Sequence, residues 1–157
     1  STRKSARKSA SAAPQDATAM LRADHKKVSA LFAQYEAARA TSRKQAIVAQ
    51  ICMELKVHTQ IEEEIFYPAV KAALKDHELV PEATVEHASV KDLIAQVEGK
   101  QPDGEMFDAK IQVMSEFVKH HVKEEQNEMF PKARKTKLDM KQLGAEMAER
   151  KRQLLAS

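Results

Sequence analysis

The sequence predicts an all-α protein in which four long helices form an up-down-up-down four-helix bundle. Composition is the first reason, because Gly (3) and Pro (5) are scarce and Trp is absent, which favours helices over strands and turns. Periodicity is the second reason, since apolar residues recur at three- and four-residue spacing in four segments. The links between these segments are short, and short links place consecutive helices antiparallel.

The first half of the chain supplies two of these helices. Asp16 is a suitable N-cap for the first helix, whose apolar stripe includes His25. Thr41 or Ser42 can cap the second helix. Pro68 lies inside the second apolar pattern and should kink or loosen the last turn, because proline lacks an N–H and crowds the preceding turn. The predicted inner stripe of the second helix is Ile47, Ile51, Leu55, His58, Glu62, Ile65 and Phe66.

The second half supplies the third and fourth helices. Pro81 suits the first turn of the third helix, and Gly99 ends it. A turn at residues 102–104 follows, in which Asp103 can cap the fourth helix, and that helix should end around Pro131. The predicted inward residues are Val85, His87, Val90, Leu93, Ile94 and Val97 in the third helix, then Phe107, Ile111, Met114, Phe117, Val118, His121, Glu125 and Met129 in the fourth.

Both ends of the chain differ from this bundle, which we assign to residues 16–133. Residues 1–15 form a predicted disordered basic tail, read as a solvated segment, with contact to nucleic acid as the alternative. Residues 134–157 form a predicted amphipathic C-terminal helix that docks either on the bundle or on a partner. The tail's basic groups are Arg3, Lys4, Arg7 and Lys8, all within residues 1–13.

Bulk properties exclude some classes of protein. No apolar run approaches the roughly 18 residues that span a membrane, so no membrane contact is expected. The single cysteine, Cys52, allows no internal disulfide, which favours a reducing cytoplasm. Cys52 itself is interpreted as a small buried residue. Nothing in the sequence indicates an oligomeric state.

A repeated motif carries the chemistry of this sequence. The segment from His58 to Pro68, HTQIEEEIFYP, aligns without gaps with HVKEEQNEMFP in the second half. In both, a His is followed four residues later by a Glu, at Glu62 and Glu125. Residues four apart share one helix face, where an imidazole and a carboxylate can chelate a divalent metal ion. Two such pairs at matching positions of a repeat are stronger evidence than one.

The repeat extends upstream. The segment DHKKVSALFAQYE, which contains His25, aligns with EHASVKDLIAQVE, which contains His87. Each half therefore carries an acid-His pair on one helix and a His-x-x-x-Glu motif on the next. Two such helix pairs, packed face to face, bring four His and two Glu to one point. The predicted metal ligands are His25, His58, Glu62, His87, His121 and Glu125.

This pattern closely resembles the hemerythrin-like HHE cation-binding family over about residues 17–133. The resemblance implies a four-helix bundle that holds a non-haem di-iron centre, with two Fe ions joined by an oxo or hydroxo bridge. Mn and Zn are alternatives for such mixed imidazole and carboxylate ligands. By the same resemblance, the four histidines are terminal ligands, whereas Glu62 and Glu125 bridge the metals. About two coordination positions then remain for a small ligand.

The implied function is binding of, or reaction with, O2, NO or peroxide, and the alternative is a non-enzymatic iron- or oxygen-sensing or metal-stabilised interaction module. The chain departs from O2-carrying hemerythrins at two places. Their third helix has two His four residues apart, whereas Ala83 and Lys91 stand at that spacing from His87 here. Their second bridging acid is an Asp five residues after its His, whereas Glu125 stands four after His121. These departures argue against simple reversible O2 carriage.

Several neighbours of the motif are rival candidates. His120 and Glu124 also stand four apart, but their repeat partners Val57 and Ile61 cannot bind metal, so His120 is interpreted as a supporting or surface residue. Tyr67 has Phe130 as its repeat partner, which favours plain packing over the alternative of a redox or hydrogen-bonding neighbour of the site. Two readings stay open for the acids before the ligand histidines, which either orient imidazoles or lie on the surface; these acids are Asp24 and Glu86. Solvated or lysine-paired positions are predicted for Glu63, Glu64 and Glu128.

Overall fold

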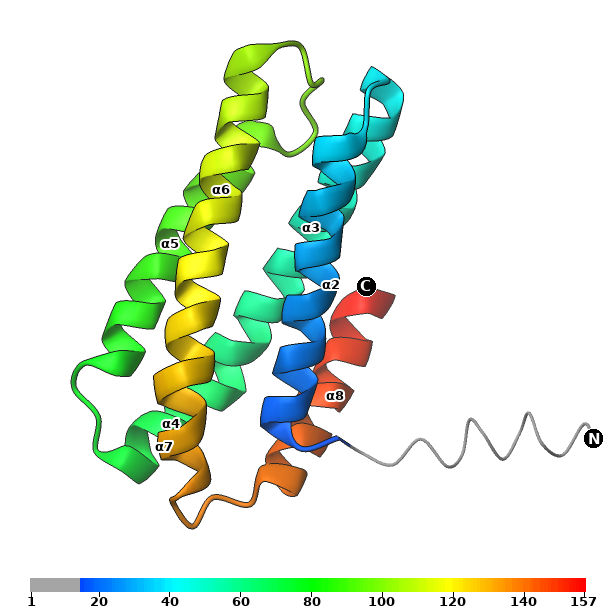
Figure 1. Cartoon of the computed structure of the whole chain (residues 1–157). Coiled ribbons are helices and arrows are strands. Elements are labelled where there is room, and N and C mark those ends of the chain that lie inside the picture. The colour runs from blue at the N-terminus through cyan, green and yellow to red at the C-terminus, as the bar shows by residue number, and fades with distance from the viewer. Residues whose placement is uncertain (1–14) are drawn as a thin grey trace, which may run out of the picture.

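The computed structural model describes residues 15–157, and within this range every regular element is a helix. Four rods run alternately up and down, and a further helix packs against their outside (Figure 1). The elements are α2 (Ala17–Ala37); α3 (Thr41–Ile61), η1 (Glu62–Phe66) and α4 (Tyr67–Leu74); α5 (Leu79–Val97); α6 (Glu105–Glu124), η2 (Glu125–Met129) and α7 (Phe130–Arg134); and α8 (Met140–Ala156). The predicted all-α bundle with an extra C-terminal helix is confirmed. Most of the predicted tail, including residues 1–13, lies outside the described residues.

The helix caps agree with the sequence at one of three places. Asp16 caps α2, because its Oδ1 accepts a hydrogen bond from the Ala19 N–H at 2.8 Å. The caps predicted for the second and fourth helices are wrong. Ala40 occupies the N-cap position of α3. Thr41 and Ser42 already lie inside the helix, past the position from which a side chain can accept from the free N–H groups. Gly104, with φ 145°, occupies the cap position of α6 in place of Asp103.

Two π-helical turns, η1 and η2, interrupt the second and fourth rods at equivalent points of the repeat. In η1 the N–H of Tyr67 bonds to the carbonyl of Glu62, five residues back, and in η2 the N–H of Phe130 bonds to Glu125. Pro68 follows the first turn and confirms the predicted loosening, since its ring crowds the carbonyl four residues earlier. The predicted end of the fourth helix at Pro131 is wrong, because α7 continues to Arg134.

The core consists of two apolar clusters stacked along the bundle axis. One cluster joins α2, α3, α5 and α6 near the end away from α8. It contains Cys52, which is fully buried, and burial raises the pKa of this thiol to about 11, in agreement with its structural role. The other cluster joins both π-turns and α8 to the N-terminal end of α2. Between these clusters lies a layer of polar side chains.

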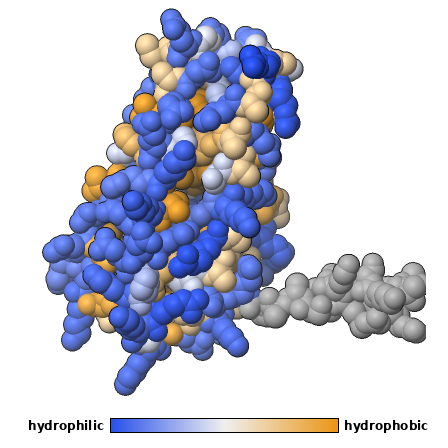
Figure 2. Space-filling model, viewed as in Figure 1, coloured by the Kyte–Doolittle hydropathy of each residue, from blue (hydrophilic) through white to orange (hydrophobic). Residues whose placement is uncertain are grey.

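Two predicted core positions face solvent instead. Val85 is 67% exposed and Phe117 is 45% exposed. Phe117 is one position before the stripe residue Val118, and one residue turns a helix by about 100°. Spacing from Met114 alone therefore placed it on the wrong face. Figure 2 shows a viewed face that is mostly hydrophilic, with separate hydrophobic side chains between polar ones.

Helix α8 docks on the bundle, which resolves the alternative that the sequence left open. It lies along α2 and α3 (Figure 1), and Leu143 and Met147 are buried in the apolar cluster below the polar layer. At Gly144 the helix approaches the start of α2 so closely that an added Cβ would lie 2.2 Å from the carbonyl oxygen of Gln15. None of the helices in residues 15–157 combines the length and apolar character that a membrane crossing requires.

Candidate metal centre

Six side chains from both halves of the repeat converge in the polar layer between the two apolar clusters. Each is at most 8% exposed. The structure therefore brings together all six residues that the sequence singled out. They are His25 on α2, His58 on α3, Glu62 on η1, His87 on α5, His121 on α6 and Glu125 on η2.

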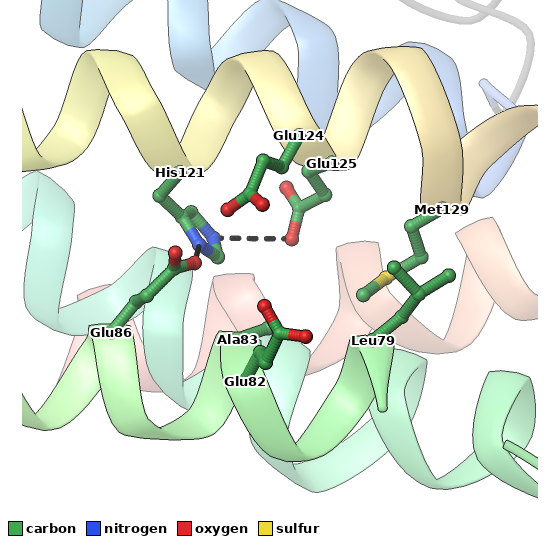
Figure 3. Close-up of a pocket in the computed structure, with 8 residues that line it drawn as sticks. All are labelled: Leu79, Glu82, Ala83, Glu86, His121, Glu124, Glu125 and Met129. Carbon is green, nitrogen blue, oxygen red and sulfur yellow. Dashed lines mark hydrogen bonds and ion pairs between the residues drawn. The ribbon is translucent and has the colours of Figure 1, made fainter. Parts of the chain in front are cut away.

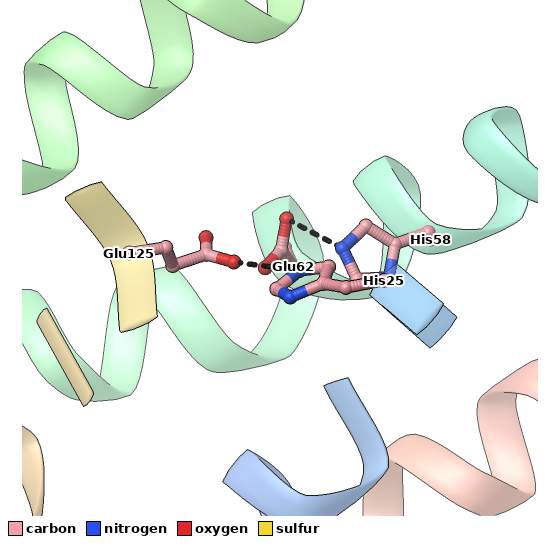
Figure 4. A group of neighbouring side chains, drawn as sticks. All are labelled: His25, His58, Glu62 and Glu125. Atoms are coloured by element: carbon pink, nitrogen blue, oxygen red, sulfur yellow. Dashed lines mark ion pairs between the residues drawn. The ribbon is translucent and has the colours of Figure 1, made fainter. Parts of the chain in front are cut away.

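One histidine pair, His25 and His58, faces both carboxylates (Figure 4). Nε2 of His25 lies 3.1 Å from Oε1 of Glu125, and Nε2 of His58 lies 3.3 Å from Oε1 of Glu62. These four residues place one ligand atom each within 4.8 Å of one another. Two ligand atoms at right angles on a metal with bonds of about 2.1 Å lie about 3 Å apart. The spacing therefore suits a metal ion.

The other histidine pair, His87 and His121, faces the same two carboxylates. Their Nε2 atoms are 3.3 Å apart. Nε2 of His87 lies 3.0 Å from Oε1 of Glu62, and Nε2 of His121 lies 3.3 Å from Oε2 of Glu125. Each carboxylate thus stands between the two histidine pairs.

Each of the four imidazoles forms a hydrogen bond through Nδ1, the ring nitrogen opposite the one that faces the cluster. The partners follow the repeat, since Asp24 and Glu86 are equivalent positions, as are Glu63 and Gln126. An oxygen that only accepts must face an N–H, so Nδ1 donates, and in the neutral ring the lone pair of Nε2 then points toward the cluster. The bonds are His25 to Gln126 Oε1 (2.8 Å), His58 to Asp24 Oδ2 (2.9 Å), His87 to Glu63 Oε2 (2.6 Å) and His121 to Glu86 Oε1 (2.7 Å).

These bonds decide between the two readings of the acids beside the motif. Asp24 and Glu86 orient imidazoles, but each acts on the histidine of the adjacent helix rather than on its own neighbour in the chain. Glu63 was predicted to be solvated or paired with lysine, and it both binds Lys91 at 2.8 Å and holds His87. The repeat contained the signal for Glu63, because its partner Gln126 does the same for His25.

Unpartnered atoms show that this cluster suits cations. Although His25 Nε2 and Glu125 Oε1 are only 3.1 Å apart, their geometry does not make a hydrogen bond. A buried polar atom without a partner costs roughly 1–3 kcal/mol, and a metal ion between such atoms satisfies several at once. The buried side-chain atoms without a hydrogen bond among residues 15–157 are His25 Nε2, His58 Nε2, Glu62 Oε2 and Glu125 Oε1.

The charges of the cluster also favour a bound cation. Burial disfavours the charged form of His58, yet the carboxylates of Glu62 and Asp24 hold its pKa well above the usual value of 6.5. Burial likewise opposes the charge of His121, but Glu125 and Glu86 raise its pKa to about 10. The carboxylates thus favour positive charge at the imidazoles. A divalent cation replaces those protons when it binds the neutral rings.

Tyr67 belongs to the site, contrary to the reading that it only packs. Its hydroxyl donates to Oε2 of Glu125 at 2.5 Å and lies 3.2 Å from Oε1 of Glu62. It also lies 3.1 Å from Nε2 of His87 and 3.2 Å from Nε2 of His121. Its repeat partner Phe130 has no hydroxyl and stacks on the ring of His25. The two halves of the site are therefore chemically different.

The rival pair, His120 and Glu124, lies at the surface. The His120 side chain is 68% exposed, and its Nε2 is 3.2 Å from Glu124 and 3.6 Å from Glu86. Figure 3 shows Glu124, Glu86 and Glu82 around a pocket between α5 and α6 that reaches the buried His121. On the opposite side of the site lies a cavity of about 20 Å³. Its apolar lining includes Val28, Leu55, Val90, Val118 and Val122.

Comparison with known proteins identifies the family. A family model described as the hemerythrin HHE cation binding domain matches residues 16–133. The chain belongs to this family. HHE domains are cation-binding domains, and the buried His and Glu cluster of this chain has the ligands to hold a metal ion. The resemblance drawn from the repeated motif is confirmed.

Two known proteins are similar to this chain, one in sequence and one in fold. A protein named DNA nickase from Nostoc sp. (strain PCC 7120 / SAG 25.82 / UTEX 2576) is 27% identical over 111 residues, which cover 71% of this chain but only 31% of that protein. A crystal structure of a hemerythrin HHE cation binding domain-containing protein from Mycobacterium kansasii has a TM-score of 0.77 at 24% identity. It covers 90% of this chain and 88% of the other, and shows a shared fold.

Proposed function

We propose that this HHE domain holds a non-haem di-iron centre and binds or reacts with O2, NO or peroxide there. One observation carries the proposal: two buried histidine pairs share two carboxylates, and four of their inward atoms have no hydrogen-bond partner. The proposed ligands are His25, His58, Glu62, His87, His121 and Glu125, with the two glutamates as bridges.

The donor set supports iron. It consists of imidazole nitrogens and carboxylate oxygens without a thiolate, because Cys52 is packed in the apolar cluster. Such ligands suit Fe or Mn, with Zn as the redox-inactive alternative. The Nδ1 bonds to Asp24 and Glu86 increase the basicity of His58 and His121 and fix their orientation.

The protein groups around the centre prepare it for a small ligand. A di-iron group supplies open coordination positions and electrons for reduction when it is bound. Tyr67 holds a proton at Oη, because burial and the charges of Glu62 and Glu125 keep its pKa well above the ordinary value of 10. The cavity of about 20 Å³ beside the four histidines has room for one or two atoms of water size. This size favours diatomic molecules and peroxide over larger substrates.

The test is metal analysis of the purified protein, followed by optical spectra on addition of O2, NO and peroxide. We expect about two irons per chain and a spectral change with at least one ligand. Adjacent histidines give a matched pair of variants. His121→Ala removes a proposed ligand and should lower the iron content to about one per chain or less, whereas His120→Ala should leave it unchanged. Protein without iron and without a spectral response would exclude the proposal.

A sensing or metal-stabilised interaction module is the second candidate. The observation in its favour is that the C-terminal helix α8 contacts a residue that holds a site histidine, since Lys151 binds Asp24 at 2.7 Å. Two irons that bind O2 or NO without turnover of peroxide would support this module over an enzyme. We retain the reducing cytoplasm as the proposed location, because a single cysteine, Cys52, allows no internal disulfide.

Contact of residues 1–13 with DNA is a separate proposal. It rests on their four basic groups and on the similarity to a protein named DNA nickase, of which the chain spans 31%. Phosphate contacts release counterions, so such binding should weaken steeply with salt. A binding assay of the full chain at low and high salt, with a variant lacking residues 1–13 as the control, tests this contact. Salt-insensitive or absent binding would exclude it.

A further inference from the structure

Four residues accept hydrogen bonds from Nδ1 of the site histidines. Within the described part of the chain, Asp24 is the one among them that is also bonded to α8. Its Oδ2 accepts from Nδ1 of His58 at 2.9 Å, and its Oδ1 accepts from Nζ of Lys151 at 2.7 Å. Asp24 is 7% exposed, and the side chain of Lys151 is 26% exposed. A buried carboxylate is thus fixed from two opposite sides by groups from two different helices.

The repeat shows that this contact is particular to one half of the site. Glu86 is the equivalent of Asp24 and holds His121, but its other neighbours are His120 at 3.6 Å and the acid Glu124. No lysine pairs with it among residues 15–157. Hydrogen bonds therefore link the pair His25 and His58 to a segment outside the repeat, whereas the bonds behind His87 and His121 in the described residues stay within the repeat.

The docking of α8 sets where Lys151 lies. Gly144 packs against the start of α2, and Met147 is fully buried one turn further on. Lys151 follows Met147 by four residues and so lies on the same helix face, above α2. The neighbouring Arg150 pairs instead with the exposed Glu64 on η1 at 2.7 Å. Among the hydrogen bonds and ion pairs of residues 15–157, Lys151 alone connects α8 to a residue that is bonded to a proposed metal ligand.

We propose that Lys151 is a positioning residue that fixes His58 through Asp24, so that cation binding at the His25–His58 position and docking of α8 reinforce each other. The inference rests on the proposed metal centre and deepens it. Outer partners of metal-bound histidines typically contribute about 10- to 100-fold to metal affinity. Coupling between two binding events is reciprocal, so a bound cation must in turn favour docked α8.

The main experiment compares Fe²⁺ and Zn²⁺ affinities, measured anaerobically by competition with a chelator, in the full chain and three variants. Lys151→Met keeps the apolar stem and removes the charge, and it should weaken one of two cation positions by about 10- to 100-fold. Lys151→Arg restores a positive donor and should recover most of that affinity. Arg150→Met removes an α8 ion pair that does not touch Asp24 and that contributes little to docking because it is exposed, so it should change neither position.

Hydrogen exchange of the unaltered protein provides a second test that needs no variant. Addition of Zn²⁺ should slow amide exchange in α8, because a bound cation fixes His58 and thereby Asp24 and Lys151. Unchanged exchange in α8, unchanged affinity in Lys151→Met, or an equal loss in Arg150→Met would each overturn the inference. A chain that binds two Zn²⁺ but no iron would exclude the di-iron function while leaving the role of Lys151 open to the same measurements.

Discussion

At the scale of single residues, Tyr67 makes the two halves of a symmetric site unequal. Its hydroxyl lies within 3.2 Å of both buried carboxylates, Glu62 and Glu125, and of Nε2 of His87 and His121. In the other half, Phe130 presents only a ring face to His25. A proton donor thus stands beside one histidine pair and an apolar ring beside the other, so the proposed chemistry on a small ligand would draw its proton from the half that contains Tyr67.

Removal of the Tyr67 hydroxyl should slow that chemistry and leave the metal in place. We expect Tyr67→Phe to retain about two irons and to react with peroxide roughly 100-fold more slowly, because a positioned acid contributes about 10²–10⁴-fold. Metal analysis and stopped-flow spectra measure both quantities. Tyr35→Phe is the matched control, since Tyr35 lies in the apolar cluster away from α8 and donates a 2.6 Å hydrogen bond to Asp108, outside the six-residue site. Equal rates in the two variants would contradict a role for Tyr67.

The sequence predicted best those site residues whose motif recurs in both halves of the repeat. The six inward side chains were predictable, because each motif occurs twice and a buried Glu needs a counter-charge. The acids behind the imidazoles were left open, because they lie about 100° around their own helices and their contacts form across to another helix. For Tyr67 the sequence favoured packing over a role beside the site, because comparison with Phe130 emphasises what the halves share and hides where they differ.

At the scale of elements, the π-turns explain how Tyr67 reaches the site. In a regular α-helix, residue 67 would be turned well away from residue 62, since five steps of about 100° are not a whole turn. In η1 the hydrogen bond spans five residues, so Tyr67 lies directly above Glu62. Sequence spacing assumes regular α-helix, and only Pro68 indicated that the turn is widened here.

A second element, α8, depends on the absence of a side chain at Gly144. Gly to Ala inside a helix normally stabilises by about 1 kcal/mol. Here the added Cβ would meet backbone atoms of Gln15, Asp16 and Ala17, which cannot move as a side-chain end can. We expect Gly144→Ala to lower the free energy of unfolding by about 1–3 kcal/mol, as overpacking does, and to speed amide exchange in α8.

The neighbouring Ala145 provides the control for helix propensity. It is exposed on the same helix, so Ala145→Gly should cost only about 1 kcal/mol and leave the contact between α8 and α2 intact. Urea unfolding and hydrogen exchange measure both variants. A gain of stability in Gly144→Ala would show that the close approach of α8 to the start of α2 is not maintained in solution.

At the scale of the whole molecule, the polar layer divides the hydrophobic core into two parts. Two-fold pairing of helices follows from the repeat, so the bundle and the central site were predictable together. The docking of α8 was not, because its stripe around Met147 matches nothing in the repeat and an amphipathic helix fits any apolar surface. Its position follows from tertiary contacts, which are the close approach at Gly144 and the bond from Lys151 to Asp24.

This buried layer should give the metal-free protein an unusual dependence of stability on pH. The folded-state pKa values of His58 and His121 are raised, the latter to about 10, so their stabilising contribution is complete below 6.5 and is lost as pH rises toward 10. The lowered pKa values of Asp24, Glu62 and Glu86 have the opposite effect. Their contribution is present above about 4.5 and is lost as pH falls further.

Chelator-treated protein should therefore be most stable between about pH 4.5 and 6.5, and its free energy of unfolding in urea should fall steadily from pH 6.5 to 9. Zn²⁺-loaded protein should not show this fall, because the cation binds neutral imidazoles and becomes more tightly held as protons leave. Glu86→Gln should flatten the fall, since Glu86 helps to raise the pKa of His121. Metal-free stability that rises between pH 6.5 and 9 would mean that the buried histidines are neutral in the folded protein, and that the carboxylates do not draw positive charge into the core.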